Sequence, residues 1–246
     1  MPATVHTIRC LTDNYAYLVQ GGGQTVLIDA PEAAPILAGL DRIGGRLDAI
    51  LLTHHHDDHI QAVPRIVAAT GAQVWGNGAD AHRLPPLDRA LSAGTGVAAC
   101  GETVTVIDVP GHTVGHVAFH FPASGLVFTA DSLMALGCGR LFEGTPAQMW
   151  DSLSRLAALP DDTLVCSGHD YCRGNGAFAL SVDPGNAALR ARLDAVTAGQ
   201  RPCSPATLAE EKATNPFLRA RDLARPDEDP LAAFARLRAG KDGFRG

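Results

Sequence analysis

Four histidines and two aspartates fall within six consecutive positions of this chain, residues 54–59. They follow the apolar run 49–52, which predicts a buried strand, and polar residues at strand ends commonly form functional sites. In an extended segment His54 and His56 project to the same side. Asp58 and His59 follow as the chain enters a predicted helix, where adjacent side chains splay apart. One metal therefore cannot readily bind all four of the donors His54, His56, Asp58 and His59. The spacing therefore predicts two neighbouring metal sites.

Three further predicted strands each lead to a histidine or an aspartate. These strands and the residues that follow them are 103–109 with His112, 126–130 with Asp131, and 163–167 with His169. Neutral imidazole and carboxylate groups suit Zn, Fe or Mn, whereas a structural zinc site more often uses cysteines. Nitrogen and oxygen donors from seven residues leave coordination positions for water. We therefore predict a dinuclear catalytic centre that activates a water molecule.

The other histidines are expected to lie outside the metal shell. His116 and His120 alternate along a predicted strand, which suggests a place behind the ligands or at the surface. His55 points opposite to its two neighbours and is expected not to be a ligand. Asp29, at the end of a predicted strand, is positioned to orient a ligand histidine. Ordinary roles are expected for His6 and His82.

The elements that must position these donors alternate along the first two thirds of the chain. The predicted strands are 15–20, 25–29, 49–53, 73–76, 103–109, 116–121, 126–130 and 163–167, and the predicted helices are 33–40, 59–70 and 145–158. This mixture indicates a layered α/β (α+β) fold. After residue 171 the chain becomes rich in alanine, arginine and leucine, which predicts helices at 186–198, 205–213 and 230–239. Ser204 is the expected N-cap of the second of these, and Gly240 the C-cap of the third. We predict a catalytic domain over 1–171 and a helical domain over 172–246.

Composition excludes some classes of partner. The formal net charge is −6, which does not favour nucleic acid, and no apolar stretch approaches membrane-spanning length. The N-terminus shows no signal-peptide pattern, so a cytoplasmic location is expected. The six cysteines contain no C-x-x-C pair and are expected to be reduced thiols.

At these residues the chain resembles the metallo-β-lactamase superfamily and, within it, the glyoxalase II (hydroxyacylglutathione hydrolase) family. The resemblance implies a four-layer αββα sandwich with a small C-terminal helical domain. It also implies two divalent metal ions per chain, with zinc favoured and iron or manganese as alternatives. By matching, the first metal would be bound by His54, His56 and His112, the second by Asp58, His59 and His169, and both by Asp131. These seven are the predicted catalytic residues.

Narrower features resemble glyoxalase II in particular. The matching segments are 137–145, which resembles the loop that meets glutathione, 169–171, 207–211 and 215–219. The resemblance implies substrate binding by Arg140, Phe142, Tyr171, Arg238 and Lys241, the last two at the glycine carboxylate of glutathione. Phe142 stands where many members have tyrosine, and Asp170 where they have glutamate.

The resemblance implies hydrolysis of S-(2-hydroxyacyl)glutathione, chiefly S-D-lactoylglutathione, to glutathione and D-lactate by a metal-bridging hydroxide. This reaction is the second step of methylglyoxal detoxification. The expected partner of the protein is a small-molecule glutathione thioester, and the protein itself is expected to be a monomer. One alternative is an iron-dependent glutathione persulfide (sulfur) dioxygenase, which uses one metal on the same fold. The complete second ligand set argues against it. Another alternative is a non-catalytic glutathione or metal sensor, which the intact donor set disfavours.

Overall fold

The computed structural model describes residues 1–245, which divide into two compact units. Unit 1 comprises Met1–Asp108 and Gly115–Phe128, and unit 2 comprises Val109–Val114 and the chain from Thr129 onward. The boundary predicted at 171/172 separates a catalytic domain from a C-terminal helical domain, and it is not the boundary between these two compact units. It stays a prediction.

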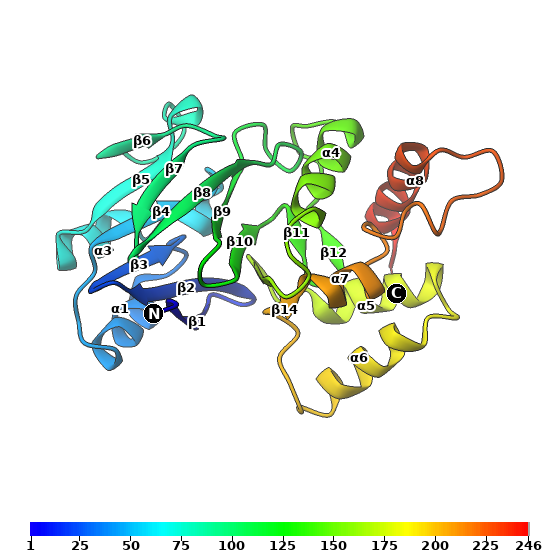
Figure 1. Ribbon diagram of the computed structural model, residues 1–246, viewed down its shortest axis with the longest axis horizontal. Coiled ribbons are helices and arrows are strands. Elements are labelled where there is room, and N and C mark those ends of the chain that lie inside the picture. Colours follow the sequence, from blue (N-terminus) through cyan, green and yellow to red (C-terminus); the bar gives the residue numbers. More distant parts are fainter. Residues whose placement is uncertain (246) are drawn as a thin grey trace. The chain divides into compact units, whose positions relative to one another are not determined.

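Unit 1 is built on a six-stranded mixed sheet whose strands follow the order of the chain (Figure 1). Its strands are β1 Thr4–Cys10, β2 Asn14–Gly21, β3 Gln24–Ile28, β4 Ala49–Leu52, β5 Gln73–Asn77 and β6 Arg89–Leu91. The pairs from β1 to β3 are antiparallel and those from β3 to β6 are parallel. Parallel neighbours need crossover connections, which here contain α1 Ala33–Arg42, α2 Asp57–Ile60 and α3 Val63–Thr70.

Two apolar layers cover the faces of this sheet. Helices α1 and α3 bury Ile36 and Ile66 against alternate strand residues such as Leu18. On the other face, Tyr17 of β2 contacts Phe128 with ring centroids 5.3 Å apart. The aromatic residues of that second layer come from an antiparallel ribbon. Its strands are β7 Gly96–Ala99, β8 Glu102–Asp108, β9 Val117–Phe121 and the start of β10 Leu126–Ala130. Unit 1 thus has one helical layer and two β layers.

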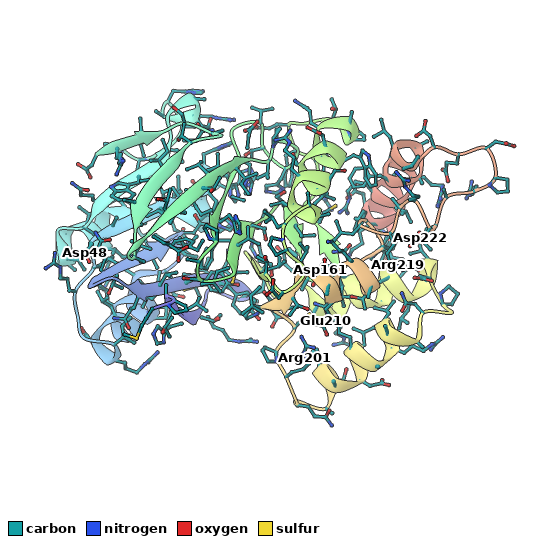
Figure 2. The ribbon with its side chains drawn as sticks, viewed as in Figure 1. Asp48, Asp161, Arg201, Glu210, Arg219 and Asp222 are labelled. Atoms are coloured by element: carbon teal, nitrogen blue, oxygen red, sulfur yellow. A yellow bond between two sulfur atoms is a disulfide. The ribbon has the colours of Figure 1, made fainter. Side chains whose placement is uncertain are left out.

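Unit 2 is mainly helical. Its helices are α4 Pro146–Ala157, α5 Cys172–Val182, α6 Ala187–Thr197, α7 Leu208–Thr214 and α8 Pro230–Gly243. Its short strands are β11 Leu133–Met134 and β12 Gly137–Cys138, which pair with each other, and β13 Leu164–Ser167, which pairs with β14 Ala206–Thr207. Figure 2 labels the side chains of Arg201 and Glu210, an ion pair between the segment before β14 and α7.

Three predicted helix limits are wrong. The helix expected over 59–70 breaks into α2 and α3, because Pro64 fits the first turn of a helix but not its interior. The helix expected to start after Ser204 starts at Leu208. Thr207 is its N-cap, whereas the Ser204 hydroxyl accepts a hydrogen bond from Ser167, 2.9 Å away. The last helix runs through its expected C-cap, Gly240, to Gly243.

The cysteine prediction is wrong for one pair, because Cys172 and Cys203 form a disulfide. The fold brings the first residue of α5 to within 6.1 Å, Cα to Cα, of a residue 31 positions later. Such proximity depends on tertiary packing and leaves no spacing motif in the sequence. The free thiols in residues 1–245 are buried and belong to Cys10, Cys100, Cys138 and Cys166. Within the same residues, the structure contains no helix with the length and apolarity needed to cross a bilayer.

Candidate metal centre

The part of the His/Asp cluster in unit 1 is organised around a buried carboxylate at the end of β3. Strands β3 and β4 are parallel neighbours, so Asp29 and Thr53 follow them at the same edge of the sheet. Asp29 accepts hydrogen bonds from the Thr53 amide and hydroxyl, each at 2.8 Å. Its Oδ2 atom also lies 2.8 Å from Nδ1 of His59. Nδ1 therefore carries the proton, and Nε2 of His59 keeps its lone pair for a metal.

The histidine rings of this unit gather around His54. Its ring centroid lies 4.8 Å from that of His56 and 4.3 Å from that of His59. The ring of His116 stacks on that of His54, with centroids 4.6 Å apart and planes 12° apart. His116 is fully buried, so of the two places expected for it, the surface is excluded. The Nδ1 atom of His54 is 3.0 Å from the Thr53 hydroxyl, which helps to fix the imidazole.

His55 has a different hydrogen-bond partner, although its ring meets that of His56 edge-on with centroids 5.1 Å apart. Its Nδ1 atom lies 3.1 Å from Oδ2 of Asp80, a buried carboxylate that also accepts a 2.6 Å hydrogen bond from Arg83. This contact agrees with the prediction that His55 is not a ligand. Asp58 is held instead by Asn14, whose side-chain amide donates to the backbone carbonyl and to a carboxylate oxygen of Asp58, both at 3.0 Å.

Unit 2 brings together the other three predicted ligands. The Nε2 atoms of His112 and His169 each lie 3.4 Å from the same oxygen, Oδ2 of Asp131. All three side chains are buried. The Nδ1 atom of His112 donates to the carbonyl of Arg140 at 2.7 Å, so its Nε2 atom is the one left with a lone pair. Two imidazole nitrogens beside one carboxylate oxygen is an arrangement that a shared cation stabilises.

A glycine keeps this arrangement compact. A Cβ atom at Gly139 would lie 1.9 Å from the carbonyl oxygen of Asp131 and 2.9 Å from Nδ1 of His112. Any other residue would force the backbone beside these two ligands to move. Sequence reasoning placed Gly139 in a loop resembling the family, but it gave no steric reason for a glycine there.

The predicted substrate-binding residues also lie in unit 2. Tyr171 stacks on His169, with ring centroids 4.6 Å apart and planes 10° apart. Phe142 is 62% exposed and meets the ring of His112 edge-on at 5.3 Å. The Arg140 guanidinium lies 5.9 Å from the centroid of Phe142. Three predicted substrate-binding residues thus lie beside two predicted metal ligands of the same unit.

The remaining two predicted residues differ in their surroundings. Arg238 is buried and donates to the carbonyl of Cys138 at 2.7 Å and to Asp242 at 2.9 Å. Lys241 instead lines a pocket of about 370 Å³. The pocket is lined by Asp170, Tyr171, Arg173, Gly174, Asn175 and Lys241. Desolvation lowers the pKa of Lys241, and the nearby positive charges of Arg238 and Arg140 lower it further.

The donor chemistry of the two units fits metal ions. His59 and His112 each have Nδ1 engaged by an acceptor, which leaves Nε2 as the coordinating atom. Carboxylates accompany these imidazoles in both units, and the combination suits borderline or hard divalent cations. The His/Asp set is compatible with a binuclear metal centre.

Some contacts of the site were missed from the sequence. Asn14 begins a strand 44 residues before its partner Asp58, and Asp80 lies 25 residues after His55. Neither forms a local motif with its partner, and only the folded sheet brings them together. The one available signal was the polar character of both residues at the ends of apolar segments, which is weak evidence by itself.

Comparison with known proteins agrees with this geometry. A family model described as the metallo-beta-lactamase superfamily matches residues 11–169, and one described as the hydroxyacylglutathione hydrolase C-terminus matches residues 170–244. A relative from Fuscovulum blasticum, named hydroxyacylglutathione hydrolase, is 59% identical over 99% of this chain and 100% of its own length. One with the same name from Ruegeria pomeroyi is 57% identical, with the same coverage.

Solved structures show the same fold. The B3 metallo-beta-lactamase BLEG-1 is 22% identical, with a TM-score of 0.69 over 87% of this chain and 99% of that one. The protein TTHA1623, crystallised in a di-iron-bound form, is 30% identical, with a TM-score of 0.65 over 87% of this chain and 100% of that one. The predicted fold class, an α/β metallo-β-lactamase sandwich with a C-terminal helical part, is confirmed. The chain belongs to the hydroxyacylglutathione hydrolase (glyoxalase II) family of the metallo-β-lactamase superfamily.

Proposed function

We propose that this chain is a metal-dependent thioesterase that hydrolyses S-(2-hydroxyacyl)glutathione, with S-D-lactoylglutathione as its main substrate. The products are glutathione and D-lactate, so the reaction is the second step of methylglyoxal detoxification. Relatives that bear the name hydroxyacylglutathione hydrolase match the chain over nearly its whole length at 50–59% identity. The observation that carries the proposal is that the complete donor set occurs in one chain with the family's C-terminal segment.

The seven predicted donors are proposed to form one binuclear centre, as the family resemblance implies. The first metal is assigned to His54, His56, His112 and Asp131, and the second to Asp58, His59, His169 and Asp131. When bound, two divalent ions lower the pKa of a water molecule and polarise a carbonyl oxygen. Zinc is the favoured metal, with iron or manganese as alternatives. The di-iron-bound form of one related protein supports a binuclear centre and leaves the metal of this chain open.

The chain's own residues contribute orientation and charge. Asp29 and the carbonyl of Arg140 hold the imidazoles of His59 and His112 in the tautomer that presents Nε2. The leaving group is a thiolate, and because a thiol has a pKa of about 8.5 it departs without a dedicated general acid. This agrees with a site in which the histidines serve as ligands rather than as proton donors.

Hydrolysis of S-D-lactoylglutathione by the metal-loaded protein tests the proposal. Thioester absorbance is followed after reconstitution with Zn, Fe or Mn, and turnover is expected with at least one of them. Asp131→Asn should remove that activity. The matched control is Asp161→Asn, which changes an exposed carboxylate paired with Lys212 (Figure 2). If none of the three metals supports thioester hydrolysis, the proposed function is wrong.

The same preparation separates the alternatives. Two metals per chain with thioester loss support the hydrolase, whereas one iron with oxygen uptake supports a persulfide dioxygenase. Binding of glutathione without turnover supports a sensor. The domain division at 171/172, the monomeric state and the cytoplasmic location remain predictions. The limits of the two family models, which meet at 169/170, support the first of these.

A further inference from the structure

Two cations without partners line the pocket at the start of α5. Arg173 and Lys241 both belong to its lining, and within residues 1–245 neither side chain has a hydrogen bond or an ion pair. Arg238, by contrast, is already bonded to Asp242 and to a backbone carbonyl. Asp170 also lines the pocket, so its ionisable carboxylate and the two cations leave one net positive charge. An unpaired arginine and lysine beside one cavity favour an anionic ligand.

One of these charges lies close to the backbone of α5. A Cβ atom placed on Gly174 would lie 3.9 Å from Nζ of Lys241, so the ammonium sits directly against the first turn of α5. Arg173 is the neighbouring residue of the same turn. The lowered pKa of Lys241 has desolvation as its main cause, followed by repulsion from Arg238; the carboxylate of Asp242 opposes the shift, and Arg140 adds to it. A carboxylate in the pocket would relieve that repulsion.

We propose that Arg173, together with Lys241, binds a carboxylate of the glutathione moiety and so determines specificity for the thiol part of the substrate. This inference rests on the proposed thioesterase function and adds a residue that the family resemblance did not supply. Glutathione has two carboxylates, one on glycine and one on the γ-glutamyl residue. Either carboxylate could be the one that Arg173 and Lys241 bind, because a guanidinium group and an ammonium group both form hydrogen bonds and ion pairs with any carboxylate. Experiments with altered thioesters distinguish the two.

The kinetic test uses Arg173→Gln, which keeps a polar side chain of similar length and removes the charge. Because the variant loses a solvated charge-assisted hydrogen bond to the substrate, we expect KM to rise about tenfold, equivalent to about 1.4 kcal/mol. The value of kcat should stay within about twofold of the wild type. Arg173→Lys should recover part of the loss. The matched control is Arg190→Gln on α6, an arginine whose side chain bonds the carbonyl of Pro184. It should behave like the wild type.

Two altered substrates identify the carboxylate. One lactoyl thioester has the glycine carboxylate converted to an amide, and the other lacks the α-carboxylate of the γ-glutamyl residue. The Arg173→Gln effect should vanish with the thioester that has lost the carboxylate bound by Arg173, and persist with the other. An equal tenfold effect with both would overturn the inference, as would a KM within twofold of wild type on the intact substrate.

Binding of S-methylglutathione, measured by calorimetry on the metal-loaded protein, separates this inference from the proposed function. If the wild type fails to hydrolyse the thioester but Arg173→Gln weakens S-methylglutathione binding about tenfold, the function is wrong and the carboxylate site stands. If hydrolysis is normal and the variant binds as tightly as the wild type, the function stands and the site is wrong. An unchanged melting temperature of Arg173→Gln excludes loss of folding as the cause of weaker binding.

Discussion

Replacing Asp29 by asparagine should weaken metal binding without disturbing the fold around it. Asp29 has φ of 56°, a left-handed conformation that asparagine adopts as readily as aspartate and alanine does not. Its Oδ1 atom accepts from the Thr53 amide, and its Oδ2 atom contacts the Thr53 hydroxyl and Nδ1 of His59. In Asp29→Asn, the amide oxygen can keep the first bond only by placing its NH₂ group where Oδ2 was.

The NH₂ group then faces Nδ1 of His59 as donor to donor. Either the hydrogen bond is lost, or the imidazole moves its proton to Nε2 and gives up the lone pair that coordinates the metal. Removal of such a supporting contact typically costs about 10–100-fold in metal affinity, equivalent to about 1.4–2.8 kcal/mol. Asp29 contacts His59 directly, whereas it reaches His54 through the Thr53 hydroxyl, so we expect the larger loss at the second metal.

Competition with a chromophoric chelator measures this affinity, with metal content determined on the same samples. Asp48→Asn is the matched control, because Asp48 accepts a 2.8 Å hydrogen bond from the Thr25 amide and pairs with Arg46 at the far end of β3 (Figure 2). It should bind both metals normally. If Asp29→Asn retains two metals with wild-type affinity, the tautomer argument is wrong.

Three further outcomes are expected. The KM for the thioester should rise as the pH approaches the pKa of Lys241, which lies below 10.5, because the ammonium that binds the carboxylate is lost as the pH rises. Lys241→Arg should remove this rise, and a KM of the wild type that does not change with pH would contradict the prediction. Arg192→Met should lower the free energy of unfolding by about 3–5 kcal/mol in denaturant titrations, because it leaves the buried carboxylate of Glu211 without its ion-pair partner. The double variant Arg192→Met with Glu211→Leu should recover part of the loss. A single variant as stable as the wild type would contradict this prediction. Gly139→Ala should reduce kcat/KM at least tenfold with secondary structure retained, because its Cβ atom would lie 1.9 Å from the carbonyl of Asp131; an active variant would mean that the loop can shift freely.

The strands that surround the site could be predicted because they are apolar and end in polar residues. Edge and short strands could not. The strand β1, for example, contains polar residues and gains its order by pairing with β2, from Thr4 opposite Gln20 to Cys10 opposite Asn14. Its structure depends on a neighbour in space, which local patterns do not reveal.

Helix α5 was missed for a related reason. It contains Gly174 and Gly176, which lower intrinsic helix propensity. A Cβ atom at Gly176 would lie 2.4 Å from Cδ2 of Leu193 on α6, so the two helices approach each other closely at this glycine. Tertiary contact between the two helices outweighs propensity at this position.

The candidate ligands could be predicted because each is an imidazole or a carboxylate that follows an apolar strand. Their supporting contacts were less accessible. Asp29 was expected to orient a histidine, and its contact with His59 bears this out. Asn14 and Asp80 were not expected, since their partners lie far away in the sequence. Arg173 was also not expected to bind substrate, because it shares a pocket with Lys241 only after the two different helices that carry these residues have packed together.

Titration of the metal-free protein with a single divalent metal, with S-D-lactoylglutathione hydrolysis measured at each step, tests the central claim most directly. If the seven proposed donors hold two ions, the hydrolysis rate should rise until two equivalents per chain are bound and stay constant thereafter. Absence of hydrolysis at two equivalents, or saturation at one equivalent with consumption of oxygen, would contradict the account.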